Sequence, residues 1–216
     1  MEKMGRLSNT NMFLTKLKNR VNELTASHVV EQIISLPIFS FDLSKDIDCN
    51  LIKDKCLKLR LEYVEHYKEN LVKNGWQSPY FTKKSKAKEF EIFSDLITLI
   101  ETKMSRIDPY ISLEIDHFWA IIYDQDNYTQ GWHNHLYEAS KKESETLHKY
   151  SAVFYPLASL NSAPIEFEQE QKENILIEAS TGKLLIFPSV ARHRVPVSSD
   201  LDLRVSMAFN FVVKLS

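Results

Sequence analysis

The sequence predicts an α+β protein in which helices come first and an antiparallel β core of the sandwich, jelly-roll or barrel class follows. In the first half of the chain, apolar residues recur at the spacings of three and four that are typical of amphipathic helices. After Pro109, apolar and β-branched residues come in short runs separated by turn sequences. No helix-length segment alternates with these runs, so a parallel sheet built from βαβ units is not expected.

The composition excludes several classes of protein. The 216 residues contain 27 Lys and Arg against 29 Asp and Glu, and this near-neutral balance argues against a dedicated nucleic-acid-binding protein. No apolar run reaches the length of about 18 residues that a membrane-spanning helix needs. There are only four glycines, too few and too scattered for a P-loop or a GxGxxG dinucleotide motif.

Two features indicate a cytoplasmic protein. The first residues lack the apolar region of a secretory signal. The two cysteines, Cys49 and Cys56, fall within one predicted helix and suit reduced core thiols better than a disulfide.

Three helices are predicted before the β core. The first covers 10–35 as an amphipathic arm, which packs either on its own domain or on a partner chain as part of a homodimer. The second covers 50–73, with Gly75 where a C-terminal cap is expected, and the third covers 87–104. We therefore divide the chain into a helical arm over residues 1–35 and a single domain over residues 36–216.

The predicted strands follow one another with turns between them. A short extended segment, Ile38–Leu43, precedes the second helix. The later strands are expected at residues 117–123, 150–156, 164–168, 174–179, 183–189, 193–197 and 203–213. A polar segment at 138–149 is predicted to be a mobile loop between strands.

Three histidines are candidate metal ligands. His133 and His135 are two residues apart, so in an extended strand their side chains point to the same face. His193 follows a later strand at a turn. Three neutral imidazoles are good ligands for iron, zinc, copper or nickel, although a pair of histidines this close together is also common as ordinary surface or core residues.

The last strand carries a candidate anion-binding residue. Alternation places Arg204, Ser206, Ala208 and Asn210 on one face, and apolar residues on the other. An arginine that faces a core is costly unless it pairs with an anion, and its planar fork suits a carboxylate. The alternative is an arginine that faces solvent at the start of its strand.

These motifs, taken in order, resemble the 2-oxoglutarate- and Fe(II)-dependent oxygenases, which are built on a double-stranded β-helix (jelly-roll) core. The resemblance covers about residues 36–213. It rests on His133-Asn134-His135, on the segment GKLLIFPSVARH that ends at His193, and on RVSMAFN, which begins at Arg204. The extended segment LPIFSFDL, the Gly-Trp-Gln-Ser sequence at 75–78 and the strand SAVFYP narrow it to a subgroup with a His-x-His pair and an FPSxxxH motif.

The resemblance implies a set of site residues. His133, His135 and His193 would bind Fe(II), with His135 in the place of the usual Asp or Glu; Glu138 and Asp126 are alternatives for that ligand. Arg204 would hold the distal carboxylate of 2-oxoglutarate. Ser206, Tyr123 and Asn210 are further candidates for cofactor binding, and the substrate pocket is expected to contain Trp132, Tyr155 and Trp76.

The function that the resemblance implies is that of a dioxygenase that hydroxylates a small molecule or a protein side chain and forms succinate and CO₂. Its partners would be the substrate and O₂, with no nucleic acid and no membrane. One alternative is a cupin-type metal enzyme that does not use 2-oxoglutarate, which would leave the charge of Arg204 unexplained. The other is a non-enzymatic β-barrel module, in which the histidines bind no metal.

Overall fold

The computed structural model describes residues 29–32, 37–64, 72–83, 87–110, 112–135, 150–170, 172–199 and 201–213. Within them the helices are α2 (Cys49–Glu62), α3 (Glu89–Ile92) and α4 (Ser94–Ile107). The strands are β1 (Val29–Gln32), β2 (Pro37–Asp42), β3 (Val72–Lys73), β4 (Trp76–Gln77), β5 (Phe81–Thr82), β6 (Leu113–Tyr123), β7 (Tyr128–His133), β8 (Tyr150–Leu157), β9 (Ile165–Phe167), β10 (Ile175–Ile177), β11 (Lys183–Pro188), β12 (His193–Ser198) and β13 (Arg204–Val213).

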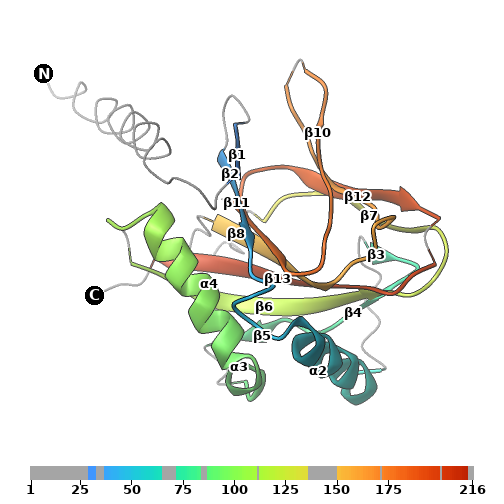
Figure 1. The fold of residues 1–216 in the computed structure, drawn as a ribbon, viewed down its shortest axis with the longest axis horizontal. Coiled ribbons are helices and arrows are strands. Elements are labelled where there is room, and N and C mark those ends of the chain that lie inside the picture. The colour runs from blue at the N-terminus through green and yellow to red at the C-terminus, as the bar shows by residue number, and fades with distance from the viewer. Residues whose placement is uncertain are drawn as a thin grey trace, which may run out of the picture.

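The described strands form two antiparallel sheets. The larger sheet has the order β1-β2-β11-β8-β13-β6-β4, with β5 also paired to β6, and the smaller has the order β10-β9-β12-β7-β3. Helices α2 and α4 cover the side of the larger sheet that faces away from the smaller sheet (Figure 1). This arrangement confirms the predicted α+β fold with a jelly-roll core. No helix within the described ranges is long and apolar enough to cross a membrane.

Three clusters of buried apolar side chains follow from this layering. The largest lies between the helices and the outer face of the larger sheet, where Cys56 and Ile100 meet Phe118 and Phe209. The other two lie between the sheets. One includes Tyr155, Phe167 and Phe187, and the other includes Trp119, Tyr123 and Tyr128. The site described below is between the sheets.

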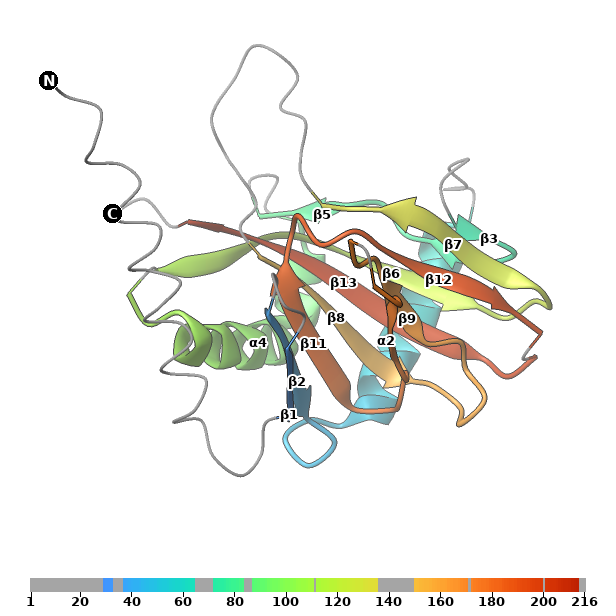
Figure 2. The same cartoon turned by 90° about the horizontal axis from the view of Figure 1, so that it is seen from above.

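The long pairing of β13 with β6 sets the geometry of the site (Figure 2). It places Arg204 opposite Tyr123, Ser206 opposite Ile121, Ala208 opposite Trp119, and Asn210 opposite His117. The intervening residues of β13, Val205, Met207, Phe209 and Phe211, are buried toward the helices. The alternation predicted for this strand is therefore confirmed.

The second predicted helix is shorter than expected. Helix α2 begins at the cap Asp48, whose carboxylate accepts a hydrogen bond from the Leu51 N–H at 3.1 Å, and it ends at Glu62. Residues 72–73, predicted to be its last turn, instead form β3 and pair with β7. Gly75 consequently lies in the turn between β3 and β4 and caps no helix.

The third predicted helix and the N-terminal arm also differ from expectation. The single helix predicted over 87–104 is divided into α3 and α4 by the buried Phe93. The apolar face predicted for it is nevertheless buried. Residues 29–32, predicted to end the helix over 10–35, form β1, because their main chain pairs with β2. The rest of that arm and the polar segment 138–149 lie outside the described residues.

The predicted thiols are free. Cys56 is buried and Cys49 half-buried, and neither forms a disulfide. Burial raises the pKa of the Cys56 thiol, so this residue is an inert part of the core.

Candidate metal and cofactor site

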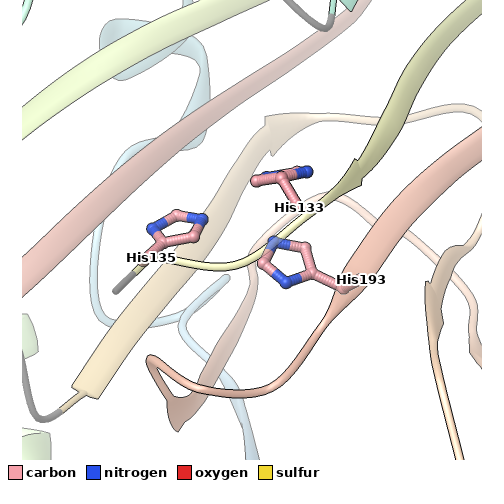
Figure 3. Close-up of side chains that lie close together, drawn as sticks. All are labelled: His133, His135 and His193. Carbon is pink, nitrogen blue, oxygen red and sulfur yellow. The ribbon is translucent and has the colours of Figure 1, made fainter. Parts of the chain in front are cut away.

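His133, His135 and His193 come together where β7 ends and β12 begins, in the smaller sheet (Figure 3). The pairing of β12 with β7 places His193 opposite His133, and His135 follows two residues beyond, just past the end of β7. The ring centroids are 4.2 Å apart for His133 and His193, and 5.0 Å apart for His135 and His193. One potential ligand atom from each residue lies within 4.8 Å of the others. The predicted trio is therefore a real cluster.

The hydrogen bonds of the three rings define their tautomers. Nδ1 of His133 donates to the carbonyl of Gly131 at 2.8 Å, and Nδ1 of His193 donates to the carbonyl of Ala191 at 2.9 Å. A carbonyl oxygen only accepts, so in both rings Nδ1 carries the proton. A neutral imidazole of this tautomer has its lone pair on Nε2, the atom that is left to bind a metal.

His135 has the same tautomer, but its partner is a side chain. Its Nδ1 donates to Oδ1 of Asn210 at 2.7 Å. Asn210 is oriented by two further contacts: Ser151 Oγ donates to the same oxygen at 2.8 Å, and the Asn210 amide nitrogen donates to Nε2 of His117 at 2.9 Å. All three rings thus share one tautomer.

Burial keeps two of these rings neutral. Loss of solvation lowers the pKa of His133, although the Gly131 carbonyl opposes this effect. The pKa of His193 lies well below its usual value because the ring is buried and because His133 and His135 are beside it. Neutral imidazole is the form that binds a metal ion, so both rings are in the binding-competent form at neutral pH.

Of the two carboxylates considered as alternatives to His135, the one that the structure describes is not in this cluster. Asp126 is exposed in the turn before β7, and Glu138 lies outside the described residues. Among the described residues, the grouped ligands are the three histidines alone. The structure thus favours His135 over Asp126.

A pocket between the sheets connects the histidines to Arg204. Its lining includes the three histidines and also Trp119, Tyr123, Tyr155, Arg204, Ser206 and Ala208. Arg204 is 2% exposed, so the predicted inward orientation is confirmed. Its Nη1 donates to the Ala163 carbonyl at 2.7 Å.

The surroundings of Arg204 are aromatic. Its guanidinium carbon lies 5.4 Å from the ring centroid of Tyr123, 5.8 Å from that of Tyr128 and 5.3 Å from that of Tyr155. Burial works against the charge, yet the three tyrosines raise the pKa of Arg204 above its ordinary value. In the described part of the chain the guanidinium has no ion-pair partner.

Several buried polar atoms in this pocket have no hydrogen-bond partner in the described residues. They include Nε of Arg204, the Tyr123 hydroxyl and Nε1 of Trp119. Buried polar groups in proteins are nearly always paired, so unpaired donors in the same pocket as a buried cation indicate a site for an anion. The donor set therefore fits 2-oxoglutarate, and the three imidazoles fit Fe(II).

Three predicted site residues lie elsewhere. Trp76 is buried in the core beneath the helices, where Nε1 donates to the Tyr63 carbonyl at 3.3 Å. Trp132 packs against Arg194, whose guanidinium carbon is 4.6 Å from the ring centroid. Neither tryptophan lines the pocket, nor does Asn210, which holds His135 instead of facing the cofactor space.

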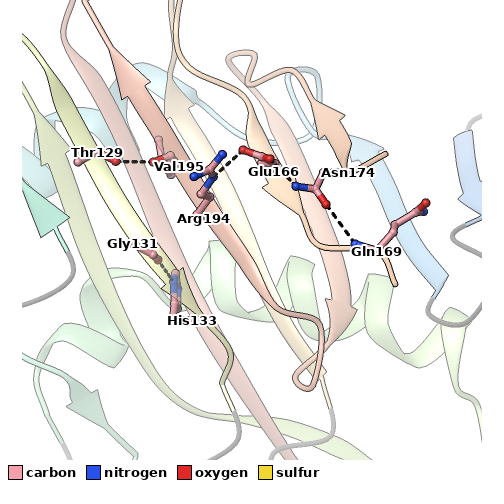
Figure 4. A network of polar contacts seen from close by, with 8 residues as sticks. All are labelled: Thr129, Gly131, His133, Glu166, Gln169, Asn174, Arg194 and Val195. Carbon is pink, nitrogen blue, oxygen red and sulfur yellow. Dashed lines mark hydrogen bonds and ion pairs between the residues drawn. The ribbon is translucent and has the colours of Figure 1, made fainter. Parts of the chain in front are cut away.

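The position of Trp132 follows from strand alternation. Because His133 points into the pocket, its neighbour points to the opposite side of the sheet. Figure 4 shows Arg194 there, with its Nε donating to Glu166 at 2.6 Å and Asn174 donating to the same carboxylate at 2.7 Å. This surface network of Arg194, Glu166 and Asn174 supports the outer side of β12 and β9.

Comparison with known proteins identifies a family that the site-bearing part of the chain resembles. Residues 117–210 match the protein family described as "Putative 2OG-Fe(II) oxygenase", a span that runs from β6 to Asn210 and includes all three histidines and Arg204. This part of the chain is therefore similar to the 2-oxoglutarate- and Fe(II)-dependent oxygenases.

Several solved structures share the fold of this chain. A prolyl hydroxylase from Trichoplax adhaerens, in complex with a peptide fragment of the hypoxia inducible factor oxygen degradation domain, superposes with a TM-score of 0.59 at 12% identity, covering 99% of this chain and 94% of that one. A viral collagen prolyl hydroxylase from Paramecium Bursaria Chlorella virus-1, in its 2-oxoglutarate complex, gives 0.58 at 12% identity, covering 82% and 96%. At such identities the likeness concerns the fold.

A curated relative matches a shorter segment of the chain. It is the protein "Required for respiratory growth protein 1, mitochondrial" from Saccharomyces cerevisiae, 42% identical over 57 residues. The match covers 26% of this chain and only 14% of the yeast protein. The matched segment therefore corresponds to a small part of that relative's length.

Proposed function

We propose that this protein is an oxygenase that hydroxylates a carbon of a small molecule or of a protein side chain, using Fe(II) held by His133, His135 and His193 and 2-oxoglutarate held by Arg204. One observation carries the proposal: the three neutral histidines and the buried guanidinium line the same pocket. A buried cation without an ion-pair partner is energetically costly. Together with a cluster of metal ligands in the same pocket, it suits a dicarboxylate that chelates a metal.

The histidines supply the metal end of this site. Their shared tautomer aims one lone pair from each ring at a common point, and their main-chain and Asn210 partners hold the rings in place. Fe(II) and 2-oxoglutarate, when bound, supply the oxidative decarboxylation that gives succinate and CO₂ and couples O₂ to oxidation of the substrate. The protein contributes the ligands, the orientation of the cosubstrate and exclusion of water.

Arg204 supplies the other end. It is four residues from Ala208 on the same face of β13, and Ala208 is opposite Trp119, whose ring centroid is 5.4 Å from that of His135. Four residues of a strand span about 13 Å, and Arg204 lines the same pocket as the histidines. Ser206 lies between the two ends, while the Tyr123 hydroxyl adds an unpaired donor beside the guanidinium.

The alternative ligand sets differ in charge. Three neutral histidines leave Fe(II) with its full double charge, whereas an Asp or Glu ligand would neutralise part of it. A more positive centre favours an anionic chelate such as 2-oxoglutarate. The three-histidine set therefore fits the proposed cosubstrate.

The proposal is tested by following 2-oxoglutarate consumption. Protein reconstituted with Fe(II), with ascorbate as reductant, should convert 2-oxoglutarate and O₂ into succinate and CO₂ even without its own substrate, at a slow rate. The variants His193→Ala and Arg204→Met should lose this turnover, whereas Arg194→Met, a cation on the outer sheet surface, should retain it. Turnover that persists in His193→Ala would overturn the ligand assignment, and absence of turnover in the wild type would overturn the proposed reaction.

A further inference from the structure

We propose that the indole N–H of Trp119 binds the metal-end carboxylate of 2-oxoglutarate and thereby fixes the orientation of the cosubstrate at the iron. This inference rests on the proposed function, because it places one more residue of the chain against the same ligand. It assigns to Trp119 a role separate from that of Arg204, at the opposite end of the pocket.

The first observation is an unpaired donor. Trp119 is 5% exposed, and its Nε1 has no hydrogen-bond partner among the described residues. An indole nitrogen only donates, so an acceptor must come from whatever occupies the pocket. Trp119 lines that pocket together with the three histidines.

The second observation is the position of the ring along β6. Trp119 and Tyr123 are four residues apart and so share a face of the strand. Tyr123 is opposite Arg204, whereas Trp119 is opposite Ala208 and lies with its ring centroid 5.4 Å from that of His135. The unpaired N–H is therefore at the metal end of the pocket, away from the guanidinium.

The third observation is that packing holds the indole in one orientation. The ring stacks on His117 at 5.7 Å between centroids and 23° between planes, and Tyr80 packs edge-on against it at 5.0 Å. Across the strand pair, the small side chain of Ala208 leaves space beside the indole. The direction of the N–H is thus set before any ligand binds.

The chemistry of the ligand identifies the acceptor. A 2-oxo acid binds a metal through its keto oxygen and one oxygen of the adjacent carboxylate. The second oxygen of that carboxylate keeps its negative charge and needs a donor, and a charge-assisted hydrogen bond to it is strong. The other unpaired donors, on Arg204, Tyr123 and Tyr155, are at the far end and serve the distal carboxylate.

Two ligands separate the two ends of the pocket experimentally. Ni(II)-loaded protein does not turn over, so binding is measured by calorimetry without catalysis. 2-Oxoglutarate reaches both the metal and Arg204, whereas oxalate chelates the metal and has no distal carboxylate. Trp119→Phe keeps an aromatic ring but removes the N–H, and Trp132→Phe on the outer sheet surface is the matched control.

We expect Trp119→Phe to weaken 2-oxoglutarate and oxalate by a similar factor of about 10 to 100. Arg204→Met should weaken 2-oxoglutarate only, and Trp132→Phe should change neither. Unchanged binding of both ligands to Trp119→Phe, or a loss confined to 2-oxoglutarate, would overturn the assignment of Trp119. If the wild-type protein binds Ni(II) and oxalate but not 2-oxoglutarate, the proposed function fails. The role of Trp119 is then still tested by comparing oxalate binding to the wild type and to Trp119→Phe.

Discussion

Nδ1 of His135 donates a hydrogen bond to Oδ1 of Asn210 at 2.7 Å, and this contact fixes the ring that we propose takes the place of the usual carboxylate ligand. Asn210 belongs to β13 and His135 follows β7, so the contact joins the two sheets across the pocket. Unlike His133 and His193, whose partners are carbonyls two residues away, His135 depends on a residue 75 positions distant in the chain. Its orientation is therefore a property of the fold.

We predict that Asn210→Ala weakens Fe(II) binding by about 10- to 100-fold, because the ring of His135 loses the acceptor that sets its tautomer. Asn210→Asp keeps an acceptor at this place and should retain most of the affinity. Metal titration by calorimetry measures both, with Asn174→Ala, a surface asparagine bonded to Glu166, as the control. Equal affinities in Asn210→Ala and the wild type would show that the contact does not orient a ligand.

Arg204 offers a test in which stability and binding move in different directions. A buried guanidinium without an ion-pair partner is costly, so Arg204→Met should leave the free energy of unfolding unchanged or raise it, by about 1–4 kcal/mol in comparable replacements. The variant should also lose the rise in melting temperature that 2-oxoglutarate gives the metal-loaded wild type.

Thermal unfolding with and without 2-oxoglutarate measures both effects. Arg194→Met, which removes a cation from the outer surface, should still respond to the ligand. A strongly destabilised Arg204→Met protein that still responds would mean that Arg204 is a structural residue.

The lowered pKa values of His133 and His193 predict that the metal-free protein is less stable in mild acid. The unfolded chain takes up protons near pH 6.5, whereas these folded rings resist protonation. Their contribution is therefore complete above about pH 6.5 and declines as pH falls toward the folded pKa values, by at most about 1.4 kcal/mol per pH unit and histidine.

Urea unfolding of the metal-free protein between pH 7.5 and 5.5 measures this loss. His193→Asn should show a shallower decline, since one of the two groups is gone. An identical decline in the variant would assign the acid sensitivity to other residues.

Gly182 tests a turn that supports β11. It has a φ of +85°, and a Cβ there would lie 2.8 Å from the Cβ of Ser44 and 2.9 Å from its backbone nitrogen. Gly182→Ala should lower the free energy of unfolding by about 2 kcal/mol or more, measured by urea unfolding against Ser180→Ala. A loss no larger than that of Ser180→Ala would show that this turn tolerates a side chain.

The sequence predicted the parts of the site that depend on the alternation of side chains along a strand. Alternation alone placed Arg204 and Ser206 on one face of their strand, although it left open whether that face pointed inward, and the same rule brought His133 and His135 to one side. Applied once more, it would have turned Trp132 outward and placed Trp119 on the face of Tyr123. The error for Trp132 came from treating sequence adjacency to a ligand as proximity in space.

Other features depended on contacts that no local pattern contains. The extension of the second helix to residue 73 followed its apolar spacing, but the pairing of β3 with β7 is a long-range contact. Trp76 is buried beneath the helices because β4 pairs with β6. A strand of two residues is too short to be predicted from a sequence pattern. The contact between Asn210 and His135 likewise requires both sheets in place.

We propose that one pocket holds Fe(II) on the three histidines together with 2-oxoglutarate bound to Arg204. Anaerobic addition of Fe(II) and then 2-oxoglutarate to the metal-free protein, followed by visible absorption, tests it most directly. We expect a weak charge-transfer band that appears only when Fe(II) and 2-oxoglutarate are both present and that is absent in His193→Ala. Iron binding without that band in the wild type, or a band that persists in His193→Ala, would contradict it.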